Sequence, residues 1–325
     1  MGFCKCIGKV LGNHYKGVAV MVATVAACAA VAAGCSSAKE SGQSPAYVGL
    51  LEDSISGIAA RYPGDIGVAV IVNDSDTVAV NDSSIYPMMS VFKLHQALAV
   101  CHDLDRRGVS LDSVVTLFRD SLDPDTWSPM LKEHQEAEIK LPVGQLLRYT
   151  LTSSDNNASN YMFHHLVDVR ATDSLIATMI PRASFRIACS EDEMQADHDK
   201  AYSNYTSPLG AAMLINKVFT DSLVSREKQD HIKTSLAECV TGTDRIVAPL
   251  LGRHGVSVAH KTGSGYVNER GELVAHNDVA YVCLPNGVSY SLAVFVKDFK
   301  GDEAQASEPV ARISAAVYSI LSGAQ

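Results

Sequence analysis

A serine and a lysine three residues apart, Ser90 and Lys93, bring a nucleophilic hydroxyl close to a group that can take its proton. The surrounding stretch Tyr86–Arg107 begins with a turn and then carries apolar side chains at helical spacing until Gly108. Residues three apart on a helix lie one turn above each other on the same face. The N–H groups at the beginning of a helix also suit a developing oxyanion. We therefore expect a nucleophile and its activator in one local unit.

The same Ser-x-x-Lys spacing recurs elsewhere in the chain, so the spacing does not identify a site by itself. Its ordinary interpretation is an N-capping serine followed by a solvated lysine. One copy, Ser36/Lys39, lies in a polar linker. Another, Ser225/Lys228, lies in a charged run that is typical of a solvated face. Position in the chain therefore favours the copy at Ser90.

Three further stretches group polar residues that can take part in chemistry. The triplet Ser-Asp-Asn at 154–156 follows an expected helix, and the run Lys-Thr-Gly-Ser-Gly at 261–265 ends a β-rich segment. The acidic stretch 190–195 lies between them, lacks helical periodicity and is predicted to be a loop. Taken singly, these stretches are typical of a cap or turn, a strand entering a glycine turn, and a solvated charge run.

The elements that position these stretches follow from the spacing of apolar residues. Helices are expected over 46–61, 90–107, 143–151, 158–167, 173–179, 209–219 and 309–321. Strands are expected over 66–72, 77–80, 256–261, 278–284 and 289–296. The two ends of the chain thus form one α/β half, about 46–86 and 246–325, and a helical half at about 87–245 is inserted between them.

Composition limits the classes of function. The chain has 325 residues, of which 47% are hydrophobic, enough for a large core. Its formal net charge is -9, and an acidic chain argues against a nucleic-acid partner. The histidines and cysteines show no metal-ligand spacing, so neither a metal nor another cofactor is expected. Cys101 falls on the apolar face of its helix and is expected to be a buried thiol.

The N-terminal segment has the order of parts found in export signals. Three lysines and no acidic residue accompany an apolar run, Gly17–Gly34, and the small residues directly before Cys35 resemble a bacterial lipobox. We expect residues 1–34 to be a lipoprotein-type signal peptide, Cys35 to be lipidated and 35–45 to be a polar tether. The chain would then reach the periplasm and be anchored in a membrane. Ordinary cleavage without a lipid and an uncleaved membrane anchor are the alternatives.

Ser-x-x-Lys, Ser-Asp-Asn and Lys-Thr-Gly, in this order, are the signature set of serine β-lactamases and penicillin-binding proteins. From about Ala46 to Leu321 the sequence resembles a class A β-lactamase. Trp127-Ser128-Pro129 resembles the aromatic wall of that family's substrate cleft, and 241–245 resembles a segment that supplies a carboxylate-binding arginine. The resemblance implies an α/β (α+β) fold of the serine β-lactamase/D,D-peptidase type, with an antiparallel sheet flanked by helices and an inserted all-helical half.

The resemblance also implies roles around Ser90, which would attack the lactam carbonyl. The N–H groups of Ser90 and Ser264 would form the oxyanion hole. Lys93 would help to deprotonate Ser90, and whether the lysine or a glutamate with water is the acylation base stays open. Ser154 would pass a proton to the departing lactam nitrogen. Asn156 would bind the substrate's side-chain amide and orient Lys93.

Substrate binding is implied for residues at the end of the β-rich segment and around the cleft. Lys261 and Thr262, with Arg245, would bind the substrate carboxylate. Gly263 and Gly265 would let the strand approach the ligand closely. The substrate-binding set implied by the resemblance is Asn156, Thr262, Gly263, Ser264, Trp127 and Arg245.

Glu191 is expected to decide between related functions, because class A enzymes use a loop glutamate to activate the deacylating water. The family pattern there is Glu-x-x-Leu-Asn, and this chain has Glu-Asp-Glu-Met-Gln. The departure leaves Glu193 as an alternative base and resembles the extended-spectrum, cephalosporin-preferring branch. Asp192 is interpreted as a solvated charge. The paired cysteines of class A carbapenemases are replaced by Met89 and Gly265.

The sequence thus predicts a monomeric β-lactamase that hydrolyses β-lactams, with a preference for cephalosporins, through a serine acyl-enzyme. One alternative is a D,D-peptidase or transpeptidase that acts on peptidoglycan with the same triads. Another is a β-lactam-binding sensor that is acylated without turnover. Turnover of a chromogenic cephalosporin distinguishes the first function from the other two.

Overall fold

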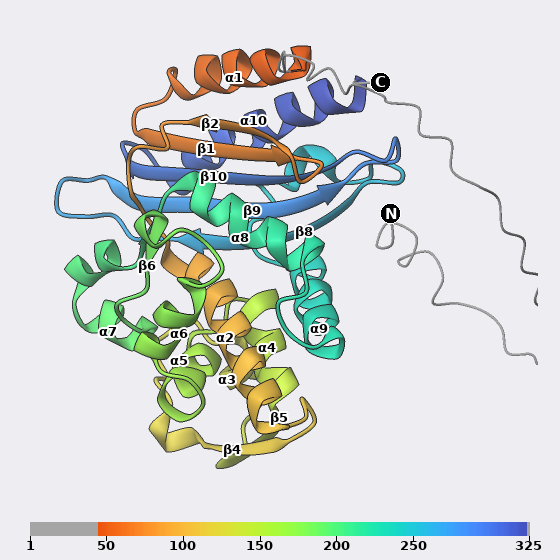
Figure 1. Cartoon of the computed structure of the whole chain (residues 1–325). Coiled ribbons are helices and arrows are strands. Elements are labelled where there is room, and N and C mark those ends of the chain that lie inside the picture. Colours follow the sequence, from red (N-terminus) through yellow and green to blue (C-terminus); the bar gives the residue numbers. More distant parts are fainter. Residues whose placement is uncertain (1–44, 324–325) are drawn as a thin grey trace, which may run out of the picture. The chain divides into compact units, whose positions relative to one another are not determined.

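The structure is a computed structural model that describes residues 45–323 (Figure 1). The predicted signal peptide, Cys35 and the tether up to residue 44 lie outside the described residues. From Ala46 onward the chain forms one compact unit. Among the helices of residues 45–323, none combines the length and the apolar character that a membrane crossing requires.

A five-stranded antiparallel sheet forms the centre of the unit. Its strands are β1 (Asp65–Val72), β2 (Asp76–Val80), β8 (Ser257–Ser264), β9 (Leu273–Cys283) and β10 (Ser289–Phe299). They pair in the order β2-β1-β10-β9-β8, which confirms the predicted antiparallel sheet and leaves β8 at an edge. The predicted β1–β2 hairpin closes at Asn73 and Asp74, whose positive φ values are typical of a tight hairpin turn.

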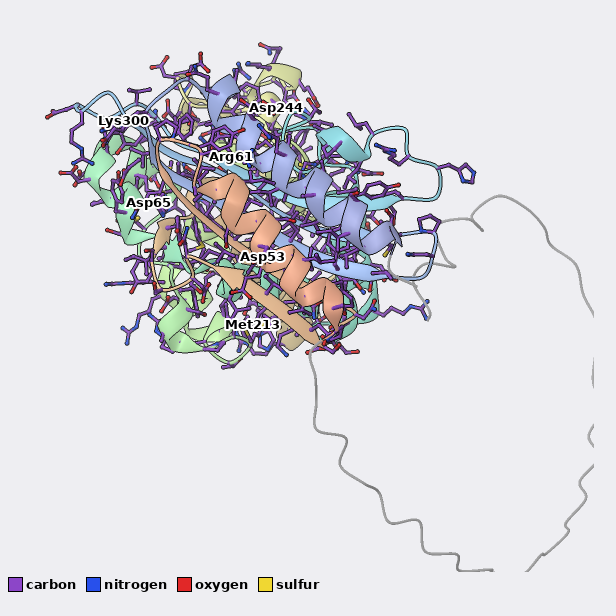
Figure 2. The ribbon with its side chains drawn as sticks, turned by 90° about the horizontal axis from the view of Figure 1, so that it is seen from above. Asp53, Arg61, Asp65, Met213, Asp244 and Lys300 are labelled. Carbon is purple, nitrogen blue, oxygen red and sulfur yellow. The ribbon has the colours of Figure 1, made fainter. Side chains whose placement is uncertain are left out.

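Two helices from opposite ends of this unit, α1 (Ala46–Ala59) and α10 (Glu303–Gly323), lie side by side on one face of the sheet (Figures 1 and 2). Their apolar side chains, such as Leu51 and Val317, are fully buried in a core shared with the strands. α10 begins earlier than the predicted start at Pro309. The Asp302 carboxylate accepts a hydrogen bond of 2.8 Å from the Gln305 N–H and so caps the helix before that proline.

The opposite face of the sheet is covered by α8 (Pro208–Thr220) and the helical half (Figure 1). The other helices of this half are α2 (Phe92–Arg107), α3 (Pro129–Glu133), α4 (Val143–Thr152), α5 (Asn156–His165), α6 (Val169–Ile176), α7 (Glu191–Ala196) and α9 (Arg226–Ala237). α2 is buried along most of its length, and Cys101 is a buried thiol as predicted. α2 therefore provides the core of the helical half.

The helical half also contains strands, which the sequence did not predict. β4 (Val114–Phe118) and β5 (Glu138–Pro142) form a two-stranded sheet, and β3 (Tyr86–Pro87), β7 (Tyr205–Thr206) and β6 (Phe185–Arg186) form a three-stranded one. Short 3-10 helices lie at Met89–Val91, Arg119–Ser121, Arg182–Ser184, His198–Ser203 and Ala248–Leu250. The inserted half is therefore mainly, but not entirely, helical.

The charged run at the beginning of α9, predicted to be a solvated face, is exposed at Arg226, Glu227 and Asp230, but Lys228 departs from the prediction. Lys228 is buried, and its Nζ lies 2.8 Å from the Oδ1 atom of Asp105 on α2. Burial by itself would raise the pKa of Asp105, but the hydrogen bonds from Lys228 and Ser225 lower it below its ordinary value. This ion pair ties α9 to the central helix.

Candidate active site

Ser90 lies in the 3-10 turn Met89–Val91, and α2 begins two residues after it, at Phe92. Met89 has a φ of 45°, which is uncommon for a residue with a side chain and indicates local strain. The side-chain amide of Asn277 on β9 donates to the carbonyl oxygen of Pro87 at 2.8 Å and to the next carbonyl at 3.3 Å. The sheet thus holds the turn that carries the predicted nucleophile.

The Ser90 hydroxyl lies between a lysine and a carboxylate. Lys93 Nζ is 3.0 Å from Ser90 Oγ, and Ser90 Oγ is 2.9 Å from Glu191 Oε1. Nζ is also 2.9 Å from Glu191 Oε1, so the three groups contact one another in pairs. The Lys93 side chain is fully buried, and 10% of the Glu191 side chain is exposed. This arrangement allows the hydroxyl proton to move to either neighbour.

Lys93 has more hydrogen-bond acceptors around it than an ammonium has protons. Besides Ser90 and Glu191, its Nζ donates to the Ser154 carbonyl at 2.9 Å and to Asn156 Oδ1 at 2.5 Å. Because an ammonium carries three donors, one of these acceptors is always left without a proton of its own. Such a site suits a group that exchanges protons during a reaction.

Ser154 and Lys261 connect the helical half to the edge strand β8. The Ser154 hydroxyl accepts a hydrogen bond of 2.9 Å from Lys261 Nζ, which also donates to the Thr262 carbonyl at 2.8 Å. Lys261 is fully buried. Burial lowers the pKa of this lysine to about 7, and the positive charge of Lys93 acts in the same direction. Two lysines therefore lie on either side of Ser154.

Most of the predicted substrate-binding residues line one cleft of about 690 Å³ beside Ser90: Trp127, Asn156, Arg245, Thr262 and Ser264 do so, whereas Gly263 does not. Trp127 is half-exposed on its wall, and the indole N–H donates to the Ser153 carbonyl at 2.8 Å, which fixes the ring. Asn156 also lines the cleft, and its Nδ2 donates to Thr126 Oγ1 at 2.9 Å while its Oδ1 contacts Lys93. Tyr266 and His198 line the cleft as well, so it combines polar groups with aromatic side chains.

Arg245 lies at the margin of this cleft with most of its donors already engaged. Nη1 donates to the carbonyl oxygens of Asn277 at 2.8 Å and Gly263 at 3.3 Å, and Nη2 donates to Ser264 Oγ at 2.5 Å. Burial lowers its pKa, although the nearby Asp278 carboxylate opposes this. The guanidinium thus braces the end of β8 and places a positive charge directly behind Ser264.

Gly263 brings β8 into contact with the turn before Ser90. A Cβ atom at Gly263 would lie 2.4 Å from the Met88 carbonyl oxygen, closer than any side chain tolerates. The absence of a side chain therefore permits the strand and the turn to touch. This contact brings the segments of Ser90 and Ser264, whose N–H groups are the predicted oxyanion donors, next to each other.

Glu191 is the first residue of α7, in a stretch that was wrongly predicted to be a loop. A capping box begins this short helix: the Ser190 N–H donates to Glu193 Oε2 at 2.9 Å. The Glu193 carboxylate is therefore occupied at the cap, whereas Glu191 contacts Ser90. Asp192 is partly exposed and pairs with His164 at 3.0 Å. The pattern Ser-x-x-Glu was the signal that could have predicted this helix.

The sequence did not single out Asn277, which the structure places beneath the nucleophile's turn. The polar triplet His-Asn-Asp at 276–278 interrupts the apolar run of β9, and all three residues are buried. Buried polar side chains need hydrogen-bond partners, so polar residues inside a buried strand are a usable signal. The partners themselves lie far away in the sequence and could not be named from it.

The chain resembles known β-lactamases over nearly all of the described unit. The sequence model of the Beta-lactamase enzyme family matches residues 50–321. A β-lactamase from Phocaeicola vulgatus is 65% identical over 285 residues, which cover 88% of this chain and 89% of that protein. The extended-spectrum β-lactamase PER-1 from Pseudomonas aeruginosa is 32% identical over 300 residues, or 92% of this chain and 95% of that protein.

A solved structure gives the same result for the fold. A representative class A β-lactamase from Bacteroides cellulosilyticus DSM 14838 has a TM-score of 0.81 at 29% identity, covering 86% of this chain and 100% of that one. The predicted family and fold class are thereby confirmed. The chain belongs to the class A β-lactamases, the serine enzymes that hydrolyse β-lactams.

Proposed function

We propose that this β-lactamase is acylated at Ser90, is freed by water that Glu191 activates, and prefers cephalosporins. The observation that carries the proposal is the double contact of Ser90 Oγ, with Lys93 Nζ at 3.0 Å and with Glu191 Oε1 at 2.9 Å. One neighbour can take the hydroxyl proton while the other remains charged, which activates the oxygen as a nucleophile.

In acylation, Ser90 Oγ bonds to the lactam carbonyl carbon, and its proton passes to the Lys93–Glu191 pair. The N–H groups of Ser90 and Ser264 stabilise the resulting oxyanion, and each such donor is typically worth about 3–4 kcal/mol. The C–N bond then breaks, and the lactam nitrogen takes a proton from Ser154. Ser154 regains the proton that left Ser90, so the Lys93–Glu191 pair is again able to accept a proton. The hydrogen bond from Lys261 to the Ser154 hydroxyl supports this proton transfer.

The substrate carboxylate binds at Lys261 and Thr262. Arg245 contributes its charge from behind the strand, because three of its four Nη hydrogens are bonded to protein oxygen atoms. Trp127 forms the apolar wall, and Asn156 contacts the substrate's side-chain amide. The position of Trp127, Asn156 and Thr262 around one cleft supports these roles.

Deacylation requires a water molecule that attacks the ester carbonyl of acylated Ser90. Glu191 takes a proton from this water, and Ser90 leaves with a proton returned by its neighbours. The contact between the Glu191 carboxylate and Ser90 supports this role. The capping-box bonds of Glu193 support Glu191 over Glu193 as the base.

Cephalosporin preference rests on the sequence of α7, which carries the base, and on the relative named as extended-spectrum. Gln195 stands where the family pattern has asparagine, and both Met194 and Gln195 line the cleft. A panel of kcat/KM values tests the preference. We expect values at least about tenfold higher for cephalosporins than for benzylpenicillin, a difference of about 1.4 kcal/mol. Equal or reversed values would overturn it.

The nucleophile is tested with a matched pair of serine variants. Ser90→Ala should give no covalent adduct with a cephalosporin by intact-protein mass spectrometry and should lose hydrolysis. Ser75→Ala removes an exposed hydroxyl from the β1–β2 turn and should behave like the parent chain. A covalent adduct in Ser90→Ala would contradict the assignment.

We further propose that Cys35 is lipidated and that the enzyme is a monomer in the periplasm, anchored to a membrane by this lipid. The support is the sequence itself, with lysines, an apolar run and small residues directly before Cys35. Cys35→Ser should abolish incorporation of labelled palmitate and release the enzyme from the membrane fraction. The released chain should elute from a sizing column as one chain. Unchanged membrane attachment or a dimeric elution volume would overturn the corresponding part.

A further inference from the structure

A cysteine, a histidine and an aspartate that the proposed reaction does not use lie close to one another at β8 and β9. Cys239 follows α9, at the point where the chain returns toward the sheet. His260 on β8 and Asp278 on β9 are both buried, and His260 Nδ1 lies 3.0 and 3.2 Å from the two Asp278 carboxylate oxygens. The charge of His260 also acts on the Cys239 thiol, whose Sγ lies 3.3 Å from Thr241 Oγ1. A thiol, a histidine and an aspartate are the groups of an activated nucleophile, its base and an acid that orients the base.

The charges in this cluster favour a thiolate. Burial by itself would lower the pKa of His260, but the Asp278 carboxylate raises it to about 10. Burial by itself would raise the pKa of Cys239, but the charge of His260, together with that of Lys261, lowers it to about 7. Imidazolium and thiolate therefore stabilise each other near neutral pH.

The other cysteines of the described chain provide an internal contrast. Burial raises the pKa of Cys101 to about 12 and that of Cys189 to about 11. Within residues 45–323, Cys101, Cys189 and Cys283 are buried, whereas Cys239 is partly exposed. Thiolate character and access together determine which cysteine reacts first. Both point to Cys239.

A short chain of hydroxyl groups connects Cys239 to the substrate cleft. Its Sγ lies 3.3 Å from Thr241 Oγ1, and Thr241 Oγ1 lies 2.6 Å from Thr262 Oγ1. Thr241 and Thr262 both line the cleft. A bulky group on Cys239 would have to displace Thr241. Thr262, which is proposed to bind the substrate carboxylate, would then lose its hydrogen-bond partner.

We propose that Cys239 is a modification site that reacts with small disulfides, such as oxidised glutathione, and that the adduct slows β-lactam hydrolysis. The Cys239 thiolate attacks one sulfur of the disulfide, so that a new S–S bond forms as the original one breaks. The other half leaves as a thiolate and takes a proton from water. Cys239 is oxidised, and the departing sulfur is reduced. The effect on hydrolysis rests on the proposed role of Thr262, but the reactivity of the thiol does not.

Reactivity is tested first on the unaltered full chain. Iodoacetamide labelling at a series of pH values, with the labelled peptides identified by mass spectrometry, should modify Cys239 before Cys101, Cys189 and Cys283. The Cys239 rate should be half-maximal near pH 7, the pKa that its neighbours impose. A midpoint above about pH 8.5, the value of an ordinary thiol, would overturn the proposal. Earlier labelling of one of the three buried cysteines would also overturn it.

A pair of histidine variants tests the cluster. His260→Gln removes the imidazolium, and the labelling rate of Cys239 at pH 7 should fall about fivefold, since lost thiolate is partly offset by higher intrinsic nucleophilicity. His254→Gln changes an exposed histidine before β8 and should leave the rate unchanged. If His260→Gln does not fold, the pH profile of the unaltered chain decides by itself. Equal Cys239 labelling rates in the two folded variants would contradict a role of His260 in activating the thiol.

The effect on hydrolysis is measured on the same preparation before and after reaction with oxidised glutathione. The adduct should lower kcat/KM for a cephalosporin about tenfold or more, since small displacements in a site cost that much, and dithiothreitol should restore it. Cys239→Ser should show the same kcat/KM before and after treatment with the disulfide. Quantitative modification with unchanged hydrolysis would overturn the proposal. The untreated chain, assayed in parallel, separates this outcome from a failure of the β-lactamase reaction itself.

Discussion

The ammonium nitrogen of Lys261 lies 2.9 Å from the hydroxyl oxygen of Ser154, so a buried hydrogen bond joins the edge strand of the sheet to the helical half. The lysine is fully buried, and its Nζ also donates to the Thr262 carbonyl. This bond joins the two halves at the place where substrate carboxylate and leaving nitrogen are expected. It therefore links substrate binding to proton transfer.

The activity should depend on the protonation of Lys261. Burial lowers the pKa of this lysine to about 7, with Cys239, Lys93 and Glu191 as its charged neighbours. As the pH rises through this value, the positive charge that binds the substrate carboxylate is lost. We expect kcat/KM to fall above about pH 7, mainly through a rise in KM, because kcat/KM follows the groups of the free enzyme.

Lys261→Arg is the matched variant for this pH profile. An arginine stays protonated across the accessible range, so its kcat/KM should remain nearly constant from about pH 7 to pH 9. The comparison uses steady-state kinetics with one cephalosporin. The same alkaline fall in the parent chain and in Lys261→Arg would show that another group is responsible.

Gly263 should tolerate no side chain. In Gly263→Ala the added methyl group would lie 2.4 Å from the Met88 carbonyl, so β8 and the nucleophile's turn must separate. We expect kcat/KM to fall about a hundredfold, as for other displacements of about 1 Å at a reacting centre. Gly57→Ala is the control, since its Cβ meets nothing within 4 Å on α1. It should keep full activity and gain up to about 1 kcal/mol in free energy of unfolding.

Asn277 should act as a positioning residue. Asn277→Ala removes the donors to the carbonyl oxygens of Pro87 and Met88, which should lower the free energy of unfolding by about 1–3 kcal/mol. The turn that carries Ser90 is then less well held, so kcat should fall more than KM rises. Asn286→Ala removes a comparable bond, to the Leu321 carbonyl, outside the cleft. Thermal unfolding and steady-state kinetics of both variants provide the test, and an equal loss of kcat in both would contradict a positioning role.

The sequence predicted the parts of the site that short motifs carry. Short local motifs identified Ser90, Lys93, Ser154 and Lys261, and the fold brings these motifs together. What could not be predicted depends on contacts between distant segments. The burial of Lys228 depends on Asp105, a partner on α2 that the local charge run does not reveal. The orientation of the Arg245 donors depends on the pairing of β8 with β9 in the same way.

Short elements were missed for a different reason. α7 is one and a half turns long, and so brief a helix shows no periodicity, although its capping box was present in the sequence. β4 and β5 are separated by residues 119–137, so no tight-turn signal joins them as a hairpin. Long elements with regular burial, such as α2 and the β1–β2 hairpin, were predicted correctly because local pattern and tertiary burial agree there.

The proposed deacylation depends most on Glu191, the carboxylate that contacts Ser90. Glu191→Gln keeps the shape of this side chain but cannot take a proton from water, so deacylation should slow by about 10²–10⁴. Glu193→Gln is the matched control, because Glu193 lies two residues away and serves in the cap of α7. It should lose at most about 2 kcal/mol of stability and continue to turn over substrate.

Intact-protein mass spectrometry during reaction with a chromogenic cephalosporin tests this directly. We expect Glu191→Gln to accumulate one covalent adduct on Ser90 that persists long after mixing. The parent chain and Glu193→Gln should show no lasting adduct. Rapid turnover in Glu191→Gln, or a trapped adduct in Glu193→Gln instead, would contradict it.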